Sequence, residues 1–379
     1  MQFRDLKAQY AALKNEIDSQ IAEVIENTSF ISGKKVSELE ELLANYVGKK
    51  YCITCANGTD ALQLALMAWN IGSGDAVFVP DFTFFSSGEV VSTVGATPIF
   101  VDVCEDTYNI SPEHLEQVIE KTIAAGQLTP KVIVAVDLFG QPAEYGRINE
   151  IADKYGLKIL EDGAQGFGGS VNGQAACSFG DISTTSFFPA KPLGCYGDGG
   201  AIFTDDDDIA VLLSSLRIHG KGESKYDNVR IGMNSRLDTI QAALLIPKFK
   251  AFKEYELDAV NVLADKYNAA LNGIVKTPVV KSGYCSSWAQ YTIQLKDVAE
   301  RDGLQSYLKQ HGVPSMIYYQ KPMHEQKAFD GIEQYDDFSI TAKLCETVLS
   351  LPMHPYMQDD EMELVVEKII EFLKSYRQC

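Results

Sequence analysis

The feature that most constrains the fold is a regular alternation of short apolar runs and helical segments between residues 51 and 204. The apolar runs are continuous, as in Ala76-Val-Phe-Val-Pro80, which is typical of strands covered on both faces of a sheet. Strands separated by helices predict a mostly parallel seven-stranded sheet in an α/β fold. The predicted strands lie near 51–55, 76–80, 97–103, 131–138, 157–161, 182–187 and 200–203.

Apolar residues at helical spacing predict helices before, within and after this region. These helices are expected at 5–26, 36–47, 59–70 and 238–268. Later segments mix strand and helix patterns. We therefore expect a large domain over residues 1–245 and a smaller α+β domain over 246–379, with the N-terminal helix as a candidate to pack on the smaller one.

The charge balance limits the possible partners. The chain has 379 residues, with 52 acidic and 33 basic side chains and a formal net charge of −19. Nucleic acid and anionic membranes require a basic face, so neither is an expected partner. The N-terminus lacks a signal-peptide core, no apolar run is long enough to span a bilayer, and the eight cysteines are scattered. These features predict a cytoplasmic protein with reduced thiols.

Metal binding is not expected either. Cys52 and Cys55 have metal-type spacing, but they lie on a predicted strand and no second pair follows nearby. The five histidines show no ligand spacing. The glycine-rich turn Gly194–Gly200 leads into a strand rather than a helix, so it is not a dinucleotide site. The acidic run Asp205–Asp208 is expected to open a helix.

A lysine, a carboxylate and a hydroxyl that follow predicted strands form the clearest candidate site. Lys191 lies in Ser186-Phe-Phe-Pro-Ala-Lys-Pro-Leu-Gly194, and Asp162 ends an earlier apolar strand. Ser186 stands five residues before the lysine. Pyridoxal 5'-phosphate (PLP) needs an amine for a Schiff base, a carboxylate for its ring nitrogen and donors for its phosphate. These residues together can hold PLP.

Each of these residues also has an ordinary structural interpretation. Asp162 could cap a helix instead of pairing with a pyridinium nitrogen. Gln165 could belong to a capping box instead of donating to the phenolic oxygen of the cofactor. Most lysines are solvated, but Lys191 has apolar neighbours, and desolvation lowers the pKa of an amine and increases its nucleophilicity.

A turn between a strand and a helix could bind the phosphate. Gly58 and Thr59 stand at the start of the helix expected at 59–70, where backbone N–H groups and a hydroxyl can face an anion. A plain helix cap is the alternative. Phe84 follows another strand and could stack on a flat cofactor, although core packing is the default for a phenylalanine.

A basic cluster stands out in an otherwise acidic chain and suits an anionic ligand such as a diphosphate or a carboxylate. A solvated loop is the alternative. The cluster comprises Arg217, His219, Lys221, Lys225, Arg230 and Arg236. His219 and His324 are possible substrate contacts, although structural roles are common for such residues.

In this order, the motifs resemble the DegT/StrS family of sugar aminotransferases, which are PLP enzymes of the aspartate-aminotransferase fold (fold type I). The resemblance spans nearly the whole chain. Its motifs are Phe3-Arg-Asp-Leu-Lys7, Asn57-Gly-Thr-Asp-Ala-Leu62, Thr83-Phe84, Glu161-Asp162, Ser186 to Lys191, Gly197-Asp-Gly-Gly200, and Asn234-Ser-Arg-Leu-Asp238 with Gln241-Ala-Ala243.

The resemblance implies a role for each candidate residue. Asn234 would reach the phosphate of the neighbouring subunit's cofactor, which requires a homodimer with shared active sites. L-Glutamate would be the amino donor and a nucleotide-linked keto sugar the acceptor. The remaining roles are a Schiff base for Lys191, the ring nitrogen for Asp162, the phenolic oxygen for Gln165, ring stacking for Phe84, and the phosphate for Gly58, Thr59 and Ser186.

Within the family, the segment Ser186–Gly200 looks most like the enzymes that aminate UDP-2-acetamido-2-deoxy-3-oxo-glucuronate in O-antigen (lipopolysaccharide) biosynthesis. Arg236 would then bind the uronate carboxylate, while Tyr318, Tyr319 and His324 would contact the sugar. Phe188 and the Gly-Asp-Gly-Gly turn suit this subgroup, whereas Gly163 departs from the commoner Ala or Cys without a functional reason.

Two alternatives stay open. The acceptor could be a 3-keto- or 4-keto-6-deoxyhexose nucleotide, because a single sequence does not define the acceptor pocket. A non-catalytic PLP-fold regulator would be expected to lack the Schiff-base lysine, and a related dehydratase branch has His in its place. The presence of Lys191 therefore favours amine transfer over both regulation and dehydration.

Overall fold

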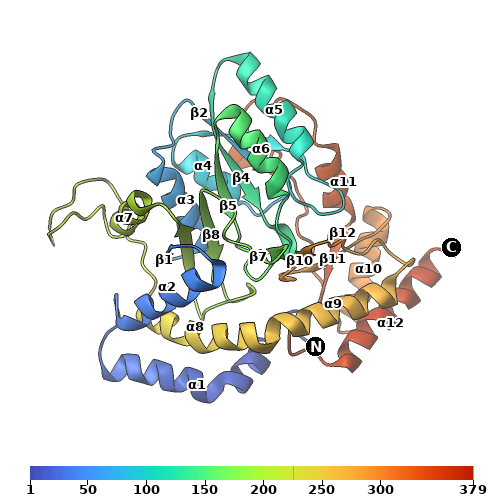
Figure 1. The fold of residues 1–379 in the computed structure, drawn as a ribbon. Coiled ribbons are helices and arrows are strands. Elements are labelled where there is room, and N and C mark those ends of the chain that lie inside the picture. The colour runs from blue at the N-terminus through green and yellow to red at the C-terminus, as the bar shows by residue number, and fades with distance from the viewer. Residues whose placement is uncertain (225, 379) are drawn as a thin grey trace.

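A seven-stranded sheet lies at the centre of the computed structural model, which describes residues 1–224 and 226–378 (Figure 1). The strand order is β1-β9-β8-β5-β4-β2-β3. β9 runs antiparallel to β1 and β8, and the other neighbouring pairs are parallel. The predicted α/β class and the seven strands are confirmed: β1 (Tyr51–Cys55), β2 (Asp75–Pro80), β3 (Thr97–Val101), β4 (Thr129–Val136), β5 (Lys158–Asp162), β8 (Ile182–Ser186) and β9 (Gly200–Thr204).

Helices connect and cover these strands. They are α1 (Leu6–Glu26), α2 (Lys34–Val47), α3 (Gly58–Ala68), α4 (Ser86–Thr93), α5 (Pro112–Ala125), the short η1 (Leu138–Gly140), α6 (Tyr145–Tyr155), α7 (Asp207–Leu216), α8 (Thr239–Ala251), the π-helical η2 (Phe252–Glu256), α9 (Leu257–Leu271), α10 (Val298–Gln310), the short η3 (Lys327–Phe329), α11 (Ser339–Thr347) and α12 (Asp359–Tyr376).

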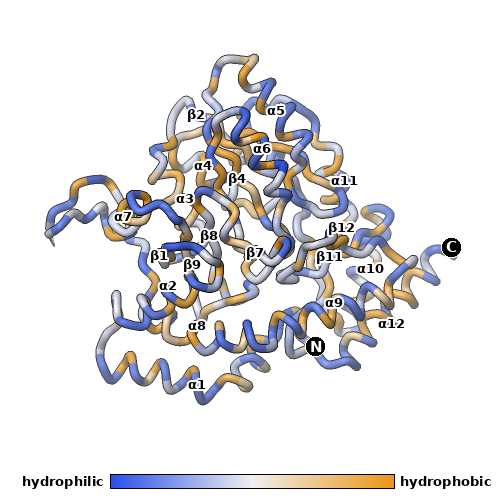
Figure 2. The backbone as a smooth tube through the Cα atoms, in the orientation of Figure 1, coloured by the Kyte–Doolittle hydropathy of each residue, from blue (hydrophilic) through white to orange (hydrophobic). Residues whose placement is uncertain are grey.

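Alternate residues of the central strands face opposite layers of helices. On β2, Val77 and Val79 join a core with α3, α4 and α7. Ala76 and Phe78 point the other way and pack with α5 and α6. Figure 2 shows the resulting hydrophobic interior, with hydrophilic residues concentrated on the outer helices. Coverage on both faces is the reason that these strands are continuously apolar.

The helices begin and end where local chemistry satisfies their free backbone groups. At α5, the Ser111 hydroxyl accepts a hydrogen bond from the His114 N–H, Pro112 occupies the first turn, and Gly126 ends the helix with a φ of 66°. At α7, the carboxylate of Asp206 accepts from the N–H groups of Asp208 and Ile209. The acidic run therefore opens a helix, as predicted.

The C-terminal part of the chain has its own hydrophobic core. Residues of α9, α10, α12 and the strands β11 (Tyr291–Gln294) and β12 (Val348–Leu351) form this cluster. α8, η2 and α9 make one long helical path from the large sheet to this core, and α1 packs along α8 (Figure 1). The domain boundary at 245/246 stays a prediction, and it falls inside α8.

One small sheet was not predicted from the sequence. β10 (Tyr284–Cys285), β6 (Ser170–Val171) and β7 (Gln174–Ala175) form a three-stranded sheet of two-residue strands.

None of the described helices combines the length and apolar character that a bilayer span requires. Over the same residues, no cluster of three or more His, Cys, Asp or Glu side chains could hold a metal ion.

Candidate active site

A cavity of about 930 Å³ opens where the parallel strands end. Ligands of open α/β sheets bind beyond the carboxyl ends of the strands, because loops from several strands converge there. The structure brings nine of the predicted site residues to this single cavity. They are Gly58, Thr59, Phe84, Asp162, Gln165, Ser186, Lys191, Tyr318 and Tyr319.

Lys191 lies in the loop between β8 and β9, beside the C-terminal end of β5. Its backbone N–H donates to the carbonyl of Phe188 over 2.8 Å, which closes a tight turn. Burial lowers the pKa of the Lys191 amine to about 8, and the negative charge of Asp162 opposes that shift. A larger share of the amine is therefore unprotonated near neutral pH, as a nucleophile requires.

Asp162 is the last residue of β5 and is only 5% exposed. One carboxylate oxygen, Oδ2, accepts from the Ser87 hydroxyl at 2.8 Å, and the other, Oδ1, accepts from the Ala164 N–H at 3.2 Å. Burial raises the pKa of Asp162, whereas the Ser87 hydrogen bond and the charge of Lys191 lower it. Ser87 thus orients the carboxylate, a role that the sequence did not reveal.

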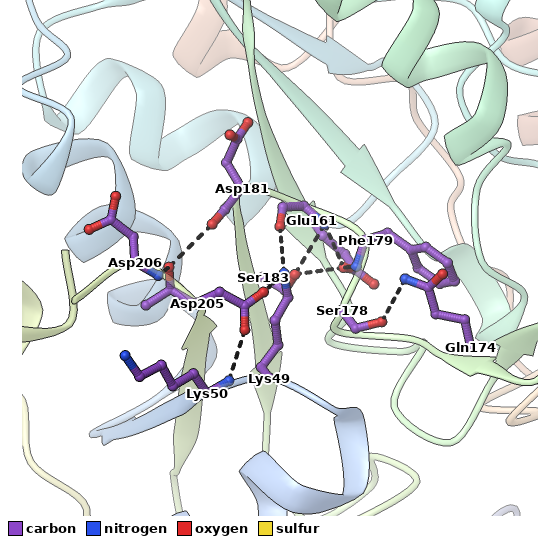
Figure 3. A network of polar contacts seen from close by, with 12 residues as sticks. Lys49, Lys50, Glu161, Gln174, Ser178, Phe179, Asp181, Ser183, Asp205 and Asp206 are labelled. Carbon is purple, nitrogen blue, oxygen red and sulfur yellow. Dashed lines mark hydrogen bonds and ion pairs between the residues drawn. The ribbon is translucent and has the colours of Figure 1, made fainter. Parts of the chain in front are cut away.

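A buried network holds the strand that carries Asp162 (Figure 3). The neighbouring Glu161 is fully buried and accepts from the Ser183 hydroxyl at 2.6 Å and from the backbone N–H groups of Phe179 and Gly180 at 2.7 and 3.1 Å. Several donors to one carboxylate compensate for its lost hydration. This network links β5 to β8, the two strands that end at Asp162 and Ser186.

The start of α3 lines the cavity with groups that could bind an anion. Asn57, rather than Thr59, caps the helix by accepting from the Asp60 N–H at 2.8 Å. The Thr59 hydroxyl lies 2.7 Å from that of Ser86. A Cβ on Gly58 would come within 2.7 Å of the Ser186 Cβ, so only glycine allows this close approach. Free N–H groups and hydroxyls at a helix N-terminus suit a phosphate.

Gln165 connects the cavity floor to the C-terminal part of the chain. Its carbonyl oxygen accepts from the Phe139 N–H at 2.7 Å, and its amide donates to the Tyr319 hydroxyl at 3.2 Å. Phe84 is 53% exposed in the cavity wall, and its ring centroid lies 6.4 Å from that of Tyr319. An exposed aromatic ring at this position can stack on a flat ligand.

Three predicted residues lie elsewhere. The His324 ring nitrogen Nδ1 lies 2.7 Å from the buried Asp81 carboxylate, and its ring stacks on Phe338. Asn234 accepts from the Arg236 guanidinium at 2.8 Å, and Arg236 lines a separate hollow beside the loop that follows α7. The structure therefore does not bring these three side chains to the Lys191 cavity, and their roles stay predictions.

The basic cluster has two parts, because Arg217 is paired inside the fold whereas four other members line the separate hollow together: His219, Lys221, Arg230 and Arg236. Arg217 forms an ion pair with Glu40 at 2.6 Å and donates to the Thr54 carbonyl, so it holds α2 and β1 together. Lys221 and Arg230 line the separate hollow with Arg236. Lys225 lies outside the described residues. The sequence could not distinguish the arginine that forms an ion pair from those that line a hollow, because the partners of each are distant in the chain.

Comparison with known proteins agrees with the geometry. Residues 11–370 match the DegT/DnrJ/EryC1/StrS aminotransferase family. The chain belongs to this family. A UDP-2-acetamido-2-deoxy-3-oxo-D-glucuronate aminotransferase of Pseudomonas aeruginosa is 42% identical, covering 96% of this chain and 98% of the relative. A UDP-N-acetyl-3-dehydro-alpha-D-glucosamine 3-aminotransferase of Acidithiobacillus ferrooxidans is 39% identical, covering 96% of each.

Solved structures confirm the fold. A DegT/DnrJ/EryC1/StrS aminotransferase from Brucella abortus is 48% identical with a TM-score of 0.96, covering 98% of this chain and 99% of the other. NtdA from Bacillus subtilis, solved with its cofactor PMP, is 27% identical with a TM-score of 0.85, covering 98% and 83%. The protein is therefore a sugar aminotransferase of fold type I, and its cofactor is PLP.

The residues present in the cavity fit this cofactor. A desolvated amine, a buried carboxylate and a glycine-containing helix start line one space.

One departure from the family pattern also has a steric reason. A Cβ at Gly163 would come within 2.5 Å of the Cys177 sulfur and 3.0 Å of the Thr184 carbonyl. Glycine at 163 therefore accommodates the cysteine packed behind the strand end.

Proposed function

We propose that this enzyme transfers the amino group of L-glutamate to UDP-2-acetamido-2-deoxy-3-oxo-glucuronate. The observation that supports the proposal is the single cavity that Lys191, Asp162, Gly58 and Ser186 line together. The 42% identity to the Pseudomonas aeruginosa enzyme supports this acceptor. Such a reaction would supply an amino uronic acid for O-antigen polysaccharides.

Bound PLP supplies an electron sink for the carbon that loses a proton during amine transfer. Lys191 would hold the cofactor through its amine, and the free amine would accept a proton from the substrate carbon and return it. Its pKa of about 8 suits both tasks, because the amine can accept and return a proton near neutral pH.

The other cavity residues would bind and orient. Asp162 would keep the ring nitrogen protonated, and Ser87 holds that carboxylate in one orientation. Gln165 would face the phenolic oxygen, and Phe84 would stack on the ring. Gly58 and Ser186, together with the Thr59 hydroxyl and the adjacent Ser86, would receive the phosphate. Tyr318 and Tyr319 would face the sugar.

We propose that the active form is a homodimer in which Asn234 and Arg236 complete the partner's cavity. Neither residue lines the cavity of its own chain, and Arg236 lines a separate hollow, which supports this arrangement. Val229 and Ile231 of the same loop are 53% and 87% exposed, which is unusual for apolar side chains without a partner surface. Arg236 would then bind the uronate carboxylate, and His324 would contribute through the segment that carries both tyrosines.

A second acceptor is favoured by one specific observation. The Acidithiobacillus ferrooxidans relative is named for a UDP-N-acetyl-3-dehydro sugar, which has no carboxylate at C6. The described cavity lining contains three carboxylates (Asp60, Asp162 and Asp198) and, besides Lys191, a single cation, Lys321. The two acceptors differ only at C6, so the residue that contacts C6 decides between them.

The test is to supply the glutamate-treated enzyme with each acceptor and follow the amino sugar product by mass spectrometry. The proposal predicts faster turnover of the 3-oxo-glucuronate than of the neutral 3-oxo sugar, and loss of this preference in Arg236→Ala. Equal or faster turnover of the neutral sugar by the wild-type enzyme would favour the second acceptor. An unchanged preference in Arg236→Ala would remove the proposed role of that arginine.

A further inference from the structure

The first five residues form a segment, here called the N-terminal strap, that is tied to the C-terminal part of the chain. The carbonyl of Phe3 accepts from the Met353 N–H at 3.3 Å. The amino group of Met1 lies 3.8 Å from the Glu361 carboxylate at the start of α12 (Figure 1). The Asp5 side chain caps α1. Contacts at both ends therefore fix the strap.

The same strap touches two segments that border the active-site cavity. The Arg4 guanidinium donates to the carbonyl of Pro192, the residue directly after Lys191, over 3.4 Å. The ring of Phe3 meets that of Tyr318 edge-on, with centroids 6.4 Å apart. Lys191 and Tyr318 lie on opposite sides of the domain boundary predicted from the sequence. The strap therefore bridges the lysine loop and the tyrosine segment.

Arg4 lacks a direct charge partner. Within residues 1–224 and 226–378, no carboxylate comes within ion-pair distance of its guanidinium, and Pro192 is the acceptor of its side-chain hydrogen bond. The acid that acts on it most, Glu256, is 3% exposed and already accepts from Gln9 at 2.9 Å and Tyr356 at 2.7 Å. The charge of Arg4 is therefore only partly compensated.

Two other basic groups lie in this region, and neither offsets the positive charge of Arg4. Lys248 is 1% exposed and its amine has no hydrogen-bond partner among the described residues. His354 is 2% exposed and burial lowers its pKa, so it adds little positive charge. Burial lowers the pKa of Arg4 to about 10, which still leaves it charged at neutral pH.

We propose that Arg4 is a positioning residue for Lys191, and the proposal rests on the function proposed above for that lysine. Its guanidinium holds the Pro192 carbonyl and thereby the loop that carries the amine, and it places a positive charge beside that amine. Asp162 attracts the protonated amine from the strand side, and Arg4 repels it from the strap side. Burial lowers the pKa of the amine most, and these two charges change it further in opposite directions.

The test measures the protonation of Lys191 in the apoenzyme. Wild type, Arg4→Gln, Arg4→Met and Arg4→Lys are labelled with a small amount of acetic anhydride across a pH range, and the labelled peptides are quantified by mass spectrometry. Removal of the charge should raise the labelling midpoint of Lys191, so that its labelling near pH 7 falls by roughly threefold to tenfold in both neutral variants. Arg4→Lys should label like the wild type.

Two controls separate this effect from a general disturbance. Lys7→Gln removes an exposed positive charge only three residues away, in the first turn of α1, and should leave the Lys191 midpoint unchanged. Lys321 serves as an internal reference, because it lines the cavity and lies on the exposed surface. Its labelling should not change in any variant.

An unchanged Lys191 midpoint in both neutral variants would overturn the proposal. A midpoint that rises equally in Arg4→Lys would also overturn it, because the charge would then be irrelevant. If one neutral variant fails to fold by circular dichroism, the other decides. The experiment uses neither cofactor nor substrate. Failure of the proposed function would instead appear as wild-type enzyme that does not transfer an amine from glutamate.

Discussion

The Lys191 cavity and the loop at residues 217–236 both carry polar residues expected to bind anions, yet the fold treats them in opposite ways. In the cavity, Asp162 is 5% exposed and is held by Ser87 and Ala164. In the loop, Ile231 is 87% exposed, and Asn234 is held by Arg236 of the same loop.

The difference lies in what holds each region in place. The cavity is organised by strand ends, and strand ends are fixed by the hydrophobic core on both faces of the sheet. The loop has little core beneath it and presents apolar side chains outward. The first region is held by contacts within one chain, and the second has the character of a surface that a second subunit would cover.

A large effect on the glutamate half-reaction is expected from removing the charge of Asp162 in the cavity. Asp162→Asn keeps the shape of the side chain but removes the negative charge that would keep the ring nitrogen protonated. We expect the rate of the glutamate half-reaction to fall by about a hundredfold or more. Stopped-flow absorption measures this rate. Near wild-type turnover would show that this carboxylate is not electronically important.

Mixed dimers test whether the loop at residues 217–236 completes the cavity of the partner subunit. Lys191→Ala and Arg236→Ala chains should each be nearly inactive with the uronate acceptor. After the two are unfolded and refolded together, about half of the dimers would be mixed, and each mixed dimer would contain one intact site. Activity should then recover to about a quarter of the wild-type value. No recovery, with mixed dimers verified by native mass spectrometry, would place both residues in the site of one chain.

Lys321 offers a smaller test within the cavity. It is the lining cation other than Lys191 and forms no ion pair with any residue that the structure describes. Because both proposed substrates carry carboxylates, Lys321→Gln should raise the KM for glutamate several-fold with little change in kcat. The exposed Lys327→Gln is the matched control, because Lys327 does not line the cavity. Equal effects of the two variants would argue for a nonspecific charge effect.

The smallest effect concerns the ion pair of His324. Its hydrogen bond to Asp81 raises the pKa of His324. A histidine with a raised pKa in the folded state stabilises the fold below its unfolded pKa, about 6.5, and loses that contribution as the pH rises through the folded value. Burial raises the pKa of Asp81 as well, and the hydrogen bond to His324 opposes that shift.

Between about pH 6 and about pH 8, wild type should therefore lose more unfolding free energy than His324→Gln. The difference should not exceed about 1 kcal/mol, because the imidazole side chain is 25% exposed and water screens the pair. Urea unfolding at several pH values measures it. Parallel pH dependence in both proteins would show that the pair does not contribute.

The sequence could predict the strands and several residues that line the Lys191 cavity, because both follow from local pattern. Continuous apolar runs marked the seven strands, and Asp162 and Ser186 could be placed because they end two of them. The two-residue strands of the small sheet carry too few residues for any period to show.

Other features depend on contacts between residues that are distant in the chain. Ser87 reaches Asp162 across 75 positions, and Arg4 reaches Pro192 across 188. The ring nitrogen of His324 meets Asp81, 243 positions earlier. Such partners are set by tertiary packing, which no local pattern contains.

The most direct test of the central claim is an absorption spectrum of the purified protein with PLP, before and after addition of L-glutamate. We predict a visible band of lysine-bound PLP that disappears on addition of glutamate, with stoichiometric release of 2-oxoglutarate. In Lys191→Ala the band of lysine-bound PLP and the response to glutamate should both be absent. A wild-type enzyme whose band does not respond to glutamate, or a Lys191→Ala variant that behaves like the wild type, would contradict this account.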